Sequence, residues 1–313
     1  MEFRKAYPDV PIGHDACGII AIAEKAGKPT HANVQRVIES LYSMAHRAGL
    51  IRGEGDGTGI QTDLPRELWA GYLEEAGFDG NLANNPRFFV GHLFIPKSSA
   101  ERVQELMDLI RVEGSRRGIK LLLERRGEIN SSVLGPVGKR TEPLFFQVAG
   151  LSTDGDGPLW ELGLVLEERF PVHVVSLSTS AVVYKVRGSA EILKRYYPEL
   201  SRAEYKSAIT LGHNRYSTNT MSTFEAVQPF GLLGHNGEIN TIERLRREGR
   251  FLGIPLTNGS DSQDLNRVLE GLLYRYALSL PEALDIVFPP ILGEIKNYSP
   301  ALQDLYMALR QRF

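Results

Sequence analysis

The sequence contains very little cysteine: Cys17 is the only one in 313 residues. One cysteine cannot form an intrachain disulfide, and it cannot alone supply the four thiolates of an iron–sulfur cluster. The seven histidines are scattered, and neither a His-Glu-x-x-His nor a Cys-x-x-Cys spacing occurs among them. We therefore expect no metal centre in this chain.

Excess charge of one sign is also missing, since the formal net charge is −2. Nucleic-acid-binding proteins usually carry a clear basic excess, and short basic clusters such as residues 244–247 are interpreted as solvated faces. No apolar run reaches the length of a membrane span, and residues 1–16 lack the apolar core of a signal peptide. The sequence therefore predicts a cytoplasmic protein without a nucleic-acid or membrane partner.

Apolar periodicity predicts helices and strands in irregular alternation. Helices are expected around residues 34–44, ending at Gly49, around 103–110 and 160–170, and over most of the chain from residue 240. Strands are expected over residues 17–23, 88–95, 119–123, 209–216 and 232–235, and from residue 60. Two β-branched runs, 172–177 and 181–186, predict a hairpin. Because crossover helices do not separate the strands regularly, an antiparallel α+β architecture is favoured over a parallel sheet.

Cys17 stands directly before Gly18 and an apolar run, and this position permits a particular chemistry. A thiol needs a base to become a nucleophilic thiolate. At a chain N-terminus its own α-amino group, with a pKa of about 7.7–8.0, can be that base. The alternative is that Cys17 is a small buried apolar side chain, as most lone cysteines are.

A set of short motifs, in a fixed order, favours the chemical interpretation of Cys17. The motifs are residues 16–18 (ACG), 45–47 (AHR), 55–59 (GDGTG), 90–91 (VG), 94–96 (FIP), 176–179 (SLST), 213–220 (HNRYSTNT), 228–230 (QPF), 235–241 (HNGEINT) and 260–262 (SDS). Together they closely resemble the amidotransferase domain of glutamate synthase large subunits, over residues 12–275. The GDGTG loop lacks phosphate-loop spacing and is interpreted as a structural turn.

The resemblance implies a class II glutamine amidotransferase domain over residues 17–313. It implies the N-terminal nucleophile hydrolase fold, an antiparallel four-layer αββα sandwich of the α+β class. Residues 1–16 would be a leader, removed by cleavage between Ala16 and Cys17. The reaction would be attack of Cys17 on the side-chain amide of glutamine, release of ammonia, and hydrolysis of a γ-glutamyl thioester.

The resemblance also assigns residues to the reacting end of the substrate. Asn236 and Gly237 would donate a side-chain and a backbone N–H to the developing oxyanion, and Arg47 would lie near the nucleophile and hold the new N-terminus. Considered alone, Asn236-Gly237 is first of all a hairpin turn.

Three further residues are assigned to the other end of glutamine. Arg215 would bind the α-carboxylate and Asp261 the α-ammonium group, with Thr218 lining the pocket beside Arg215. Each has a simpler alternative, since a lone arginine at a strand end is usually a surface ion pair and Asp261 could be a helix N-cap.

The destination of the ammonia is left open by the sequence. Residues 221–224 (MSTF) depart from the proline–tryptophan segment usual in the family. The flavin and iron–sulfur domains of a complete synthase are not in these 313 residues, so FMN and the cluster are expected only in partner domains or subunits. A synthase partner that aminates 2-oxoglutarate is favoured. The alternatives are another ammonia acceptor, or an unprocessed, inactive regulatory subunit.

Overall fold

A computed structural model describes residues 17–51, 53–216, 223–257 and 259–312. Within these residues two four-stranded antiparallel sheets form, and their strands come from distant parts of the chain. The first sheet has the order β1 (Gly18–Ala23), β10 (Ile209–Asn214), β4 (Thr58–Asp63), β9 (Ala181–Val186). The second has the order β6 (Ile119–Arg126), β7 (Leu144–Ser152), β5 (Phe88–Ile95), β8 (His173–Ser178).

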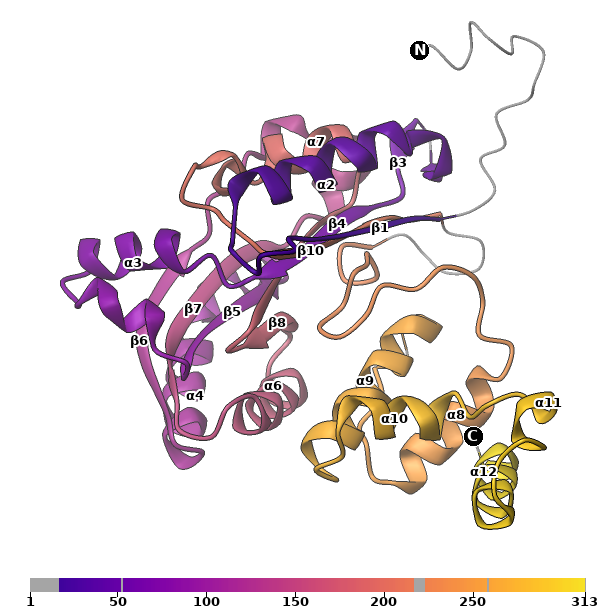
Figure 1. Ribbon diagram of the computed structural model, residues 1–313. Coiled ribbons are helices and arrows are strands. Elements are labelled where there is room, and N and C mark those ends of the chain that lie inside the picture. Colours follow the sequence, from indigo (N-terminus) through magenta and orange to yellow (C-terminus); the bar gives the residue numbers. More distant parts are fainter. Residues whose placement is uncertain (1–16, 52, 217–222, 258, 313) are drawn as a thin grey trace, which may run out of the picture.

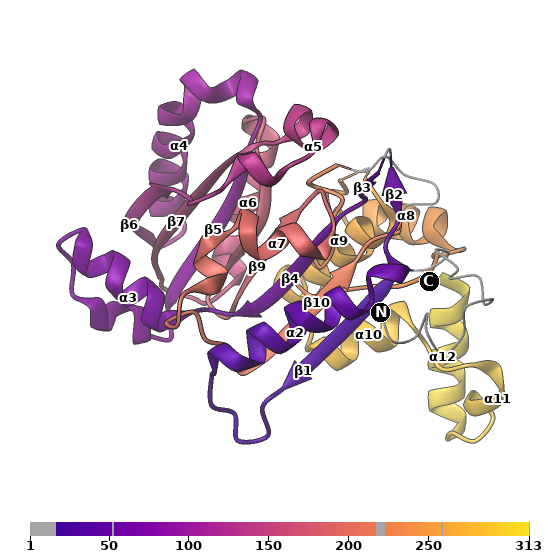
Figure 2. The same cartoon turned by 90° about the horizontal axis from the view of Figure 1, so that it is seen from above.

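Helices cover the outer face of each sheet (Figures 1 and 2). Helices α2 (His31–Ser43) and α7 (Ala190–Tyr196) pack on the first sheet, and α4 (Val103–Arg116) and α6 (Gly157–Arg169) pack on the second. One apolar core joins fully buried side chains of both sheets with those of α2 and α7, and it includes Ile60, Phe88, Val90 and Val182. Removal of this apolar surface from water is the main force that holds the layers together. The predicted αββα sandwich is confirmed.

Shorter elements connect these layers. The short strands are β2 (Leu50–Ile51) and β3 (Glu54–Gly55), and the connecting helices are α3 (Arg66–Glu75) and α5 (Pro136–Thr141). Short 3₁₀ helices lie at Ala45–Arg47, Gly80–Asn84, Lys97–Arg102, Ser131–Val133 and Pro198–Ser201. The first of these turns follows α2, which ends at Ser43 and not at the predicted Gly49.

The predicted hairpin over residues 172–186 is wrong. Both strands exist, but β8 pairs with β5 in the second sheet while β9 pairs with β4 in the first. The chain passes from one sheet to the other at Thr179-Ser180, where Asp156 accepts hydrogen bonds from the Ser178 hydroxyl (2.8 Å) and the Thr179 N–H (2.6 Å). Spacing in the sequence predicts a strand, a turn and a strand, but it does not say which neighbour each strand will choose.

The predicted strand over residues 232–235 is also wrong, because these residues form an irregular segment. Side chains, not a neighbouring strand, satisfy its backbone: the N–H of Leu232 donates to Asn266 Oδ1 at 2.9 Å and that of His235 to Gln228 Oε1 at 2.7 Å. The strand at the cysteine begins at Gly18, and its residues alternate in burial, as in a strand with one covered face.

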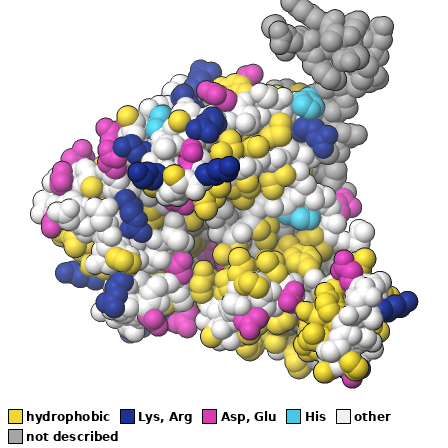
Figure 3. Space-filling model, in the orientation of Figure 1, with side chains coloured by type: hydrophobic (Ala, Val, Ile, Leu, Met, Phe, Trp, Pro, Cys, Tyr) yellow, Lys and Arg dark blue, Asp and Glu magenta, His cyan; other side chains and the backbone are white. Residues whose placement is uncertain are grey.

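The C-terminal part is helical, as predicted from residue 240. Its helices are α8 (Ile242–Phe251), α9 (Asp261–Tyr274), α10 (Leu280–Val287), α11 (Leu292–Ile295) and α12 (Pro300–Arg312). Helices α8, α9 and α10 share a separate apolar core that includes Leu245, Val268 and Leu272. Apolar side chains also gather on the outer surface of α10–α12 (Figure 3), among them Phe288 and Leu305, which are about half exposed. Across the described residues, every helix is too short or too polar to cross a membrane.

Candidate active site

Cys17 lies at the end of the first sheet, where β1 begins beside the last residue of β10. Gly18 pairs with Asn214, so the thiol reaches the residues that follow β10. The backbone N–H of Tyr216 donates to Sγ at 3.2 Å, and Sγ lies 3.5 Å from the Tyr216 carbonyl oxygen. Burial raises the pKa of the Cys17 thiol, against the opposing effects of the Tyr216 N–H and the charge of Arg215. The thiol therefore needs a base before it can act as a nucleophile at neutral pH.

A cavity of about 340 Å³ opens beside this thiol, a size within the usual range for small-molecule sites. Four of the residues assigned from the sequence line it together: Cys17, Arg215, Gly237 and Asp261. They come from separate segments: Cys17 and Arg215 flank β1 and β10 of the first sheet, Gly237 lies in the irregular segment before α8, and Asp261 begins α9. The cavity presents a thiol, a guanidinium and a carboxylate to a single ligand.

Arg215 is buried, with an exposed fraction of 5%. Its backbone is fixed on both sides, because its N–H donates to the Gly57 carbonyl and its own carbonyl accepts from the Gly49 N–H. Burial lowers the pKa of Arg215, while the charges of Asp56, Cys17 and Asp261 act in the opposite direction. The surface ion-pair alternative is therefore wrong: Arg215 is a buried cation at the wall of the cavity.

Asn236 and Gly237 approach Cys17 from the irregular segment before α8. The Asn236 side-chain amide donates to the backbone carbonyl of Cys17 at 3.1 Å. Gly237 has a φ of +102°, a conformation that favours glycine, and it lines the cavity. Since residues 232–235 are not a strand, the Asn-Gly pair is not a β-hairpin turn.

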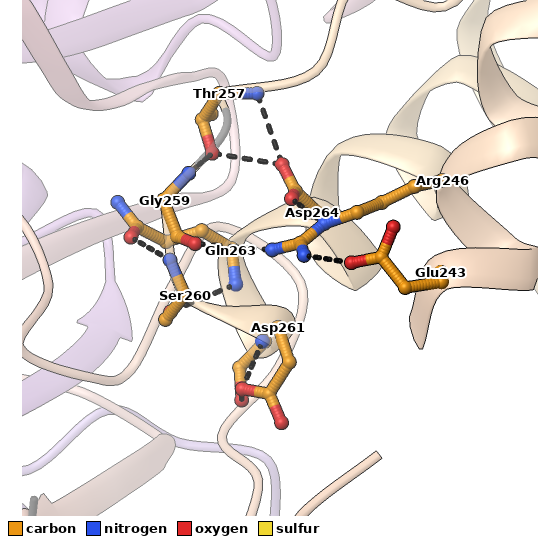
Figure 4. Close-up of polar contacts among 9 residues, drawn as sticks. Glu243, Arg246, Thr257, Gly259, Ser260, Asp261, Gln263 and Asp264 are labelled. Carbon is orange, nitrogen blue, oxygen red and sulfur yellow. Dashed lines mark hydrogen bonds and ion pairs between the residues drawn. The ribbon is translucent and has the colours of Figure 1, made fainter. Parts of the chain in front are cut away.

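Asp261 is the first residue of α9, and Ser260 is the N-cap, with the reciprocal bonds of a capping box to Gln263. The N-cap alternative for Asp261 is therefore wrong. Its Oδ2 accepts the N–H of Ile239 at 3.1 Å, and its Oδ1 accepts the N–H of Ser262 at 2.6 Å. The carboxylate is thus held between α9 and the segment that carries Asn236. Figure 4 shows Asp261 at the start of α9.

The two remaining assigned residues, Arg47 and Thr218, are not among the described residues that line the cavity. Arg47 is beside the nucleophile, since a Cβ built on Gly18 would be 3.4 Å from the Arg47 Cβ. Its side chain is exposed, and it is not one of the described residues that line the cavity. Thr218 belongs to residues 217–222, which are outside the described part of the chain.

Several polar residues at the cavity received no role from the sequence. Gln228 and Ser262 belong to the QPF and SDS motifs, which assign them no role, and both are buried at the cavity. A polar side chain in an otherwise apolar segment, such as Gln228 between Val227 and Phe230, is the signal that could have found the first of them.

Arg246 corrects the interpretation of residues 244–247 as a solvated face. It lines the cavity, its side chain is only 18% exposed, and its Nε donates to the buried Asp264 at 2.7 Å. The same guanidinium binds Glu243 at 2.8 Å and the Gly259 carbonyl at 3.2 Å (Figure 4). The ion pair joins α8 to the start of α9, next to Asp261.

Comparison with known proteins defines the class of this site. Residues 17–250 match the family described as class II glutamine amidotransferases, which is most of the chain. The chain therefore belongs to the class II glutamine amidotransferases, and its two antiparallel sheets between helices are the N-terminal nucleophile hydrolase fold of that class. Hydrolysis of glutamine is the general activity of such domains. The extension of the domain to residue 313 stays a prediction.

Similar curated proteins are glutamate synthases. Over 93% of its length the chain is 33% identical to the ferredoxin-dependent glutamate synthase 2 of a Synechocystis strain. It is 30% identical over 91% of its length to the NADH glutamate synthase of Saccharomyces cerevisiae, and 31% over 74% to the NADPH glutamate synthase large chain of Azospirillum brasilense. The chain spans only 20%, 15% and 16% of these relatives, respectively.

Proposed function

We propose that this chain hydrolyses glutamine through a γ-glutamyl thioester on Cys17, with removal of residues 1–16 as the activating step. The observation that carries the proposal is the single cavity lined by Cys17, Arg215, Gly237 and Asp261. Glutamine has an amide at one end and a zwitterion at the other, and this cavity offers matching chemistry for both.

Two charged side chains that line the cavity, Arg215 and Asp261, would bind the zwitterionic end of glutamine. The Arg215 guanidinium can bind the α-carboxylate through two parallel N–H donors, which is the geometry that favours arginine over lysine. The Asp261 carboxylate, already fixed by two backbone N–H groups, can accept the α-ammonium group. Binding at these two points would direct the side-chain amide toward Sγ.

The reaction begins with a proton transfer from the Cys17 thiol to the α-amine of the same residue. The α-amine of a processed Cys17 takes the thiol proton, and Sγ bonds to the amide carbon while its oxygen becomes an oxyanion. The Asn236 side chain and the Gly237 N–H donate to this oxyanion. When it collapses, the carbon–nitrogen bond breaks and the amine returns the proton to the departing ammonia. Water then hydrolyses the thioester to glutamate. While residue 16 is attached, the Cys17 nitrogen is an amide and cannot be the base.

We further propose that the ammonia passes to a synthase domain or subunit, as in a glutamate synthase. The support is that the similar proteins carry that name and are five or more times longer than the matched region. FMN and an iron–sulfur cluster would belong to that partner, because amide hydrolysis needs neither. Residues 17–313 would supply the glutaminase half-reaction.

Ammonia release tests the proposed hydrolysis directly. We expect the chain that begins at Cys17 to form glutamate and ammonia from glutamine in equal amounts, and to leave asparagine intact because its shorter side chain does not reach Sγ. A coupled assay for both products is the measurement. Ammonia without glutamate, or equal rates with asparagine, would contradict the proposed reaction.

Arg215 and Asp261 should control affinity for the two α-groups. Loss of one charge-assisted contact costs about 1.5–3 kcal/mol, so Arg215→Ala and Asp261→Ala should each lower kcat/KM by roughly 10- to 150-fold. Arg215→Lys should recover only part of this loss, because a single ammonium cannot reproduce the guanidinium fork. Steady-state kinetics would measure the effect, with the exposed Arg36→Ala as control. Unchanged kinetics in both alanine variants would remove them from the binding site.

A further inference from the structure

His235 immediately precedes Asn236, and side chains bind both of its backbone polar groups. Its N–H donates to Gln228 Oε1 at 2.7 Å, and its carbonyl oxygen accepts from Gln228 Nε2 at 3.1 Å. His213 Nε2 lies 3.1 Å from the same oxygen. Burial lowers the pKa of His213 to about 4, so its ring is neutral and Nε2–H is the donor. Both lone pairs of the His235 carbonyl are therefore used.

The backbone of Gln228 is in turn pressed against the first sheet. A Cβ at Gly59, in β4, would lie 2.5 Å from the Gln228 carbonyl oxygen, and one at Gly57 would lie 2.3 Å from Val227 Cγ2. Only glycine permits this close approach at the two positions. The glycines of the GDGTG loop thus allow Gln228 to pack directly against β4. The hydrogen bonds from the Gln228 amide then hold His235 in place relative to the first sheet.

Ser262 connects the same amide to Asp261. The Ser262 hydroxyl donates to Asp261 Oδ1 at 3.1 Å, and it lies 3.4 Å from Gln228 Nε2 and 3.3 Å from His235 Nδ1. A hydroxyl can donate only one hydrogen bond, and this one goes to Asp261. In the other two contacts, Gln228 Nε2 and His235 Nδ1 therefore donate to the Ser262 oxygen. One buried oxygen therefore joins the residue at the ammonium end of the cavity to the residue before Asn236.

We propose that Gln228 is a positioning residue that fixes the Asn236 and Gly237 donors relative to Cys17. Ser262 couples the hydrogen bonds between Gln228 and His235 to Asp261. The inference rests on the proposed function, since it concerns the oxyanion donors of that reaction. Two bonds from one planar amide restrain His235 much as a neighbouring strand would. Donors that must meet a developing charge contribute only when they are held in place beforehand.

Gln228→Leu removes both bonds to His235 while keeping a side chain of similar reach. We expect kcat for glutamine hydrolysis to fall by about 10- to 100-fold, since small misplacement of catalytic groups costs up to about 100-fold. KM should change less than threefold, because Arg215 and Asp261 are untouched. The matched control is Gln147→Leu, the same change at a buried glutamine of the second sheet. That control should alter the unfolding temperature but not kcat.

Gln228→Glu gives a readout that a merely structural role would not produce. An ionised carboxylate still accepts the His235 N–H, but it places a second negative oxygen against the His235 carbonyl. A protonated carboxyl group can again accept from the His235 N–H and donate to the His235 carbonyl, as the glutamine amide does. The ratio of kcat in this variant to that of the wild type should therefore rise as the pH is lowered. Burial raises the pKa of a carboxyl group above about 4.3, which brings the recovery into a measurable range.

Ser262→Ala and the double variant test the coupling. If Gln228 and Ser262 act as one unit, the double variant should lose no more than about threefold beyond the worse single variant, whereas independent effects would multiply. Inactive wild-type protein would defeat the proposed function, not this inference. Active wild type with unchanged kcat in Gln228→Leu, or a Gln228→Glu ratio independent of pH, would overturn the positioning role. Multiplicative losses would overturn the coupling to Asp261.

Discussion

Cys17→Ser should lose glutaminase activity by a factor on the order of 10⁴ or more, as enzymes do when a nucleophile is removed. An alcohol is far harder to deprotonate than a thiol, and the α-amine is a weak base that cannot compensate. The structure sharpens this expectation, because burial already raises the pKa of the Cys17 thiol. The measurement is ammonia release at saturating glutamine.

Binding provides the control for this variant. Cys17→Ser should bind glutamine with an affinity close to that of the wild type in calorimetry, since Arg215 and Asp261 remain in place. Its unfolding temperature should also be nearly unchanged, because serine is close in size to cysteine. Normal turnover by Cys17→Ser would show that another residue is the nucleophile.

Asn236→Asp should lower kcat by about two to three orders of magnitude, the usual effect of losing one oxyanion donor. The substitution keeps the size of the side chain but presents a carboxylate where negative charge develops. It also sets a carboxylate against the Cys17 carbonyl oxygen, which now accepts from the Asn236 amide at 3.1 Å. KM should change much less, because the oxyanion contact forms mainly in the transition state.

Two further variants make this test specific. Asn236→Ala should behave like Asn236→Asp. Lys97→Ala, at a half-exposed lysine that pairs with the buried Glu142 away from the cavity, should leave both kinetic constants unchanged. A rise in KM with kcat intact would mean that Asn236 binds ground-state glutamine, and the oxyanion donor would then have to be sought elsewhere.

The sequence predicted the layers of the fold better than its connections. The run of residues 88–95, apolar except for His92, matches β5 residue for residue, because a strand covered on both faces is mostly apolar. β7 was not predicted, although it pairs along both edges with β6 and β5. Strand partners depend on contacts between residues far apart in the chain, which is why β8 and β9 were wrongly joined as a hairpin.

The site was predictable where a motif carries its own chemistry. Cys17, Arg215, Gly237 and Asp261 come from motifs with a reactive or charged group, and the structure brings them to one cavity. Gln228 and the other members of its hydrogen-bond network bind neighbouring backbone groups. The sequence did not predict them because it predicted a strand over residues 232–235, whose backbone would have been paired with another strand. Arg246 was misjudged because its partner, Asp264, lies on another helix.

Mapping the N-terminus of the active protein tests most directly whether Cys17 is an N-terminal nucleophile. Active protein would be labelled with a diazoketone analogue of glutamine and digested, and the modified peptide identified by mass spectrometry. We predict that the label lies on Sγ of Cys17, in a peptide that starts with Cys17 and has a free α-amine, in proportion to the activity lost. Full activity in protein that retains residues 1–16, or a label on any other residue, would contradict the proposed mechanism.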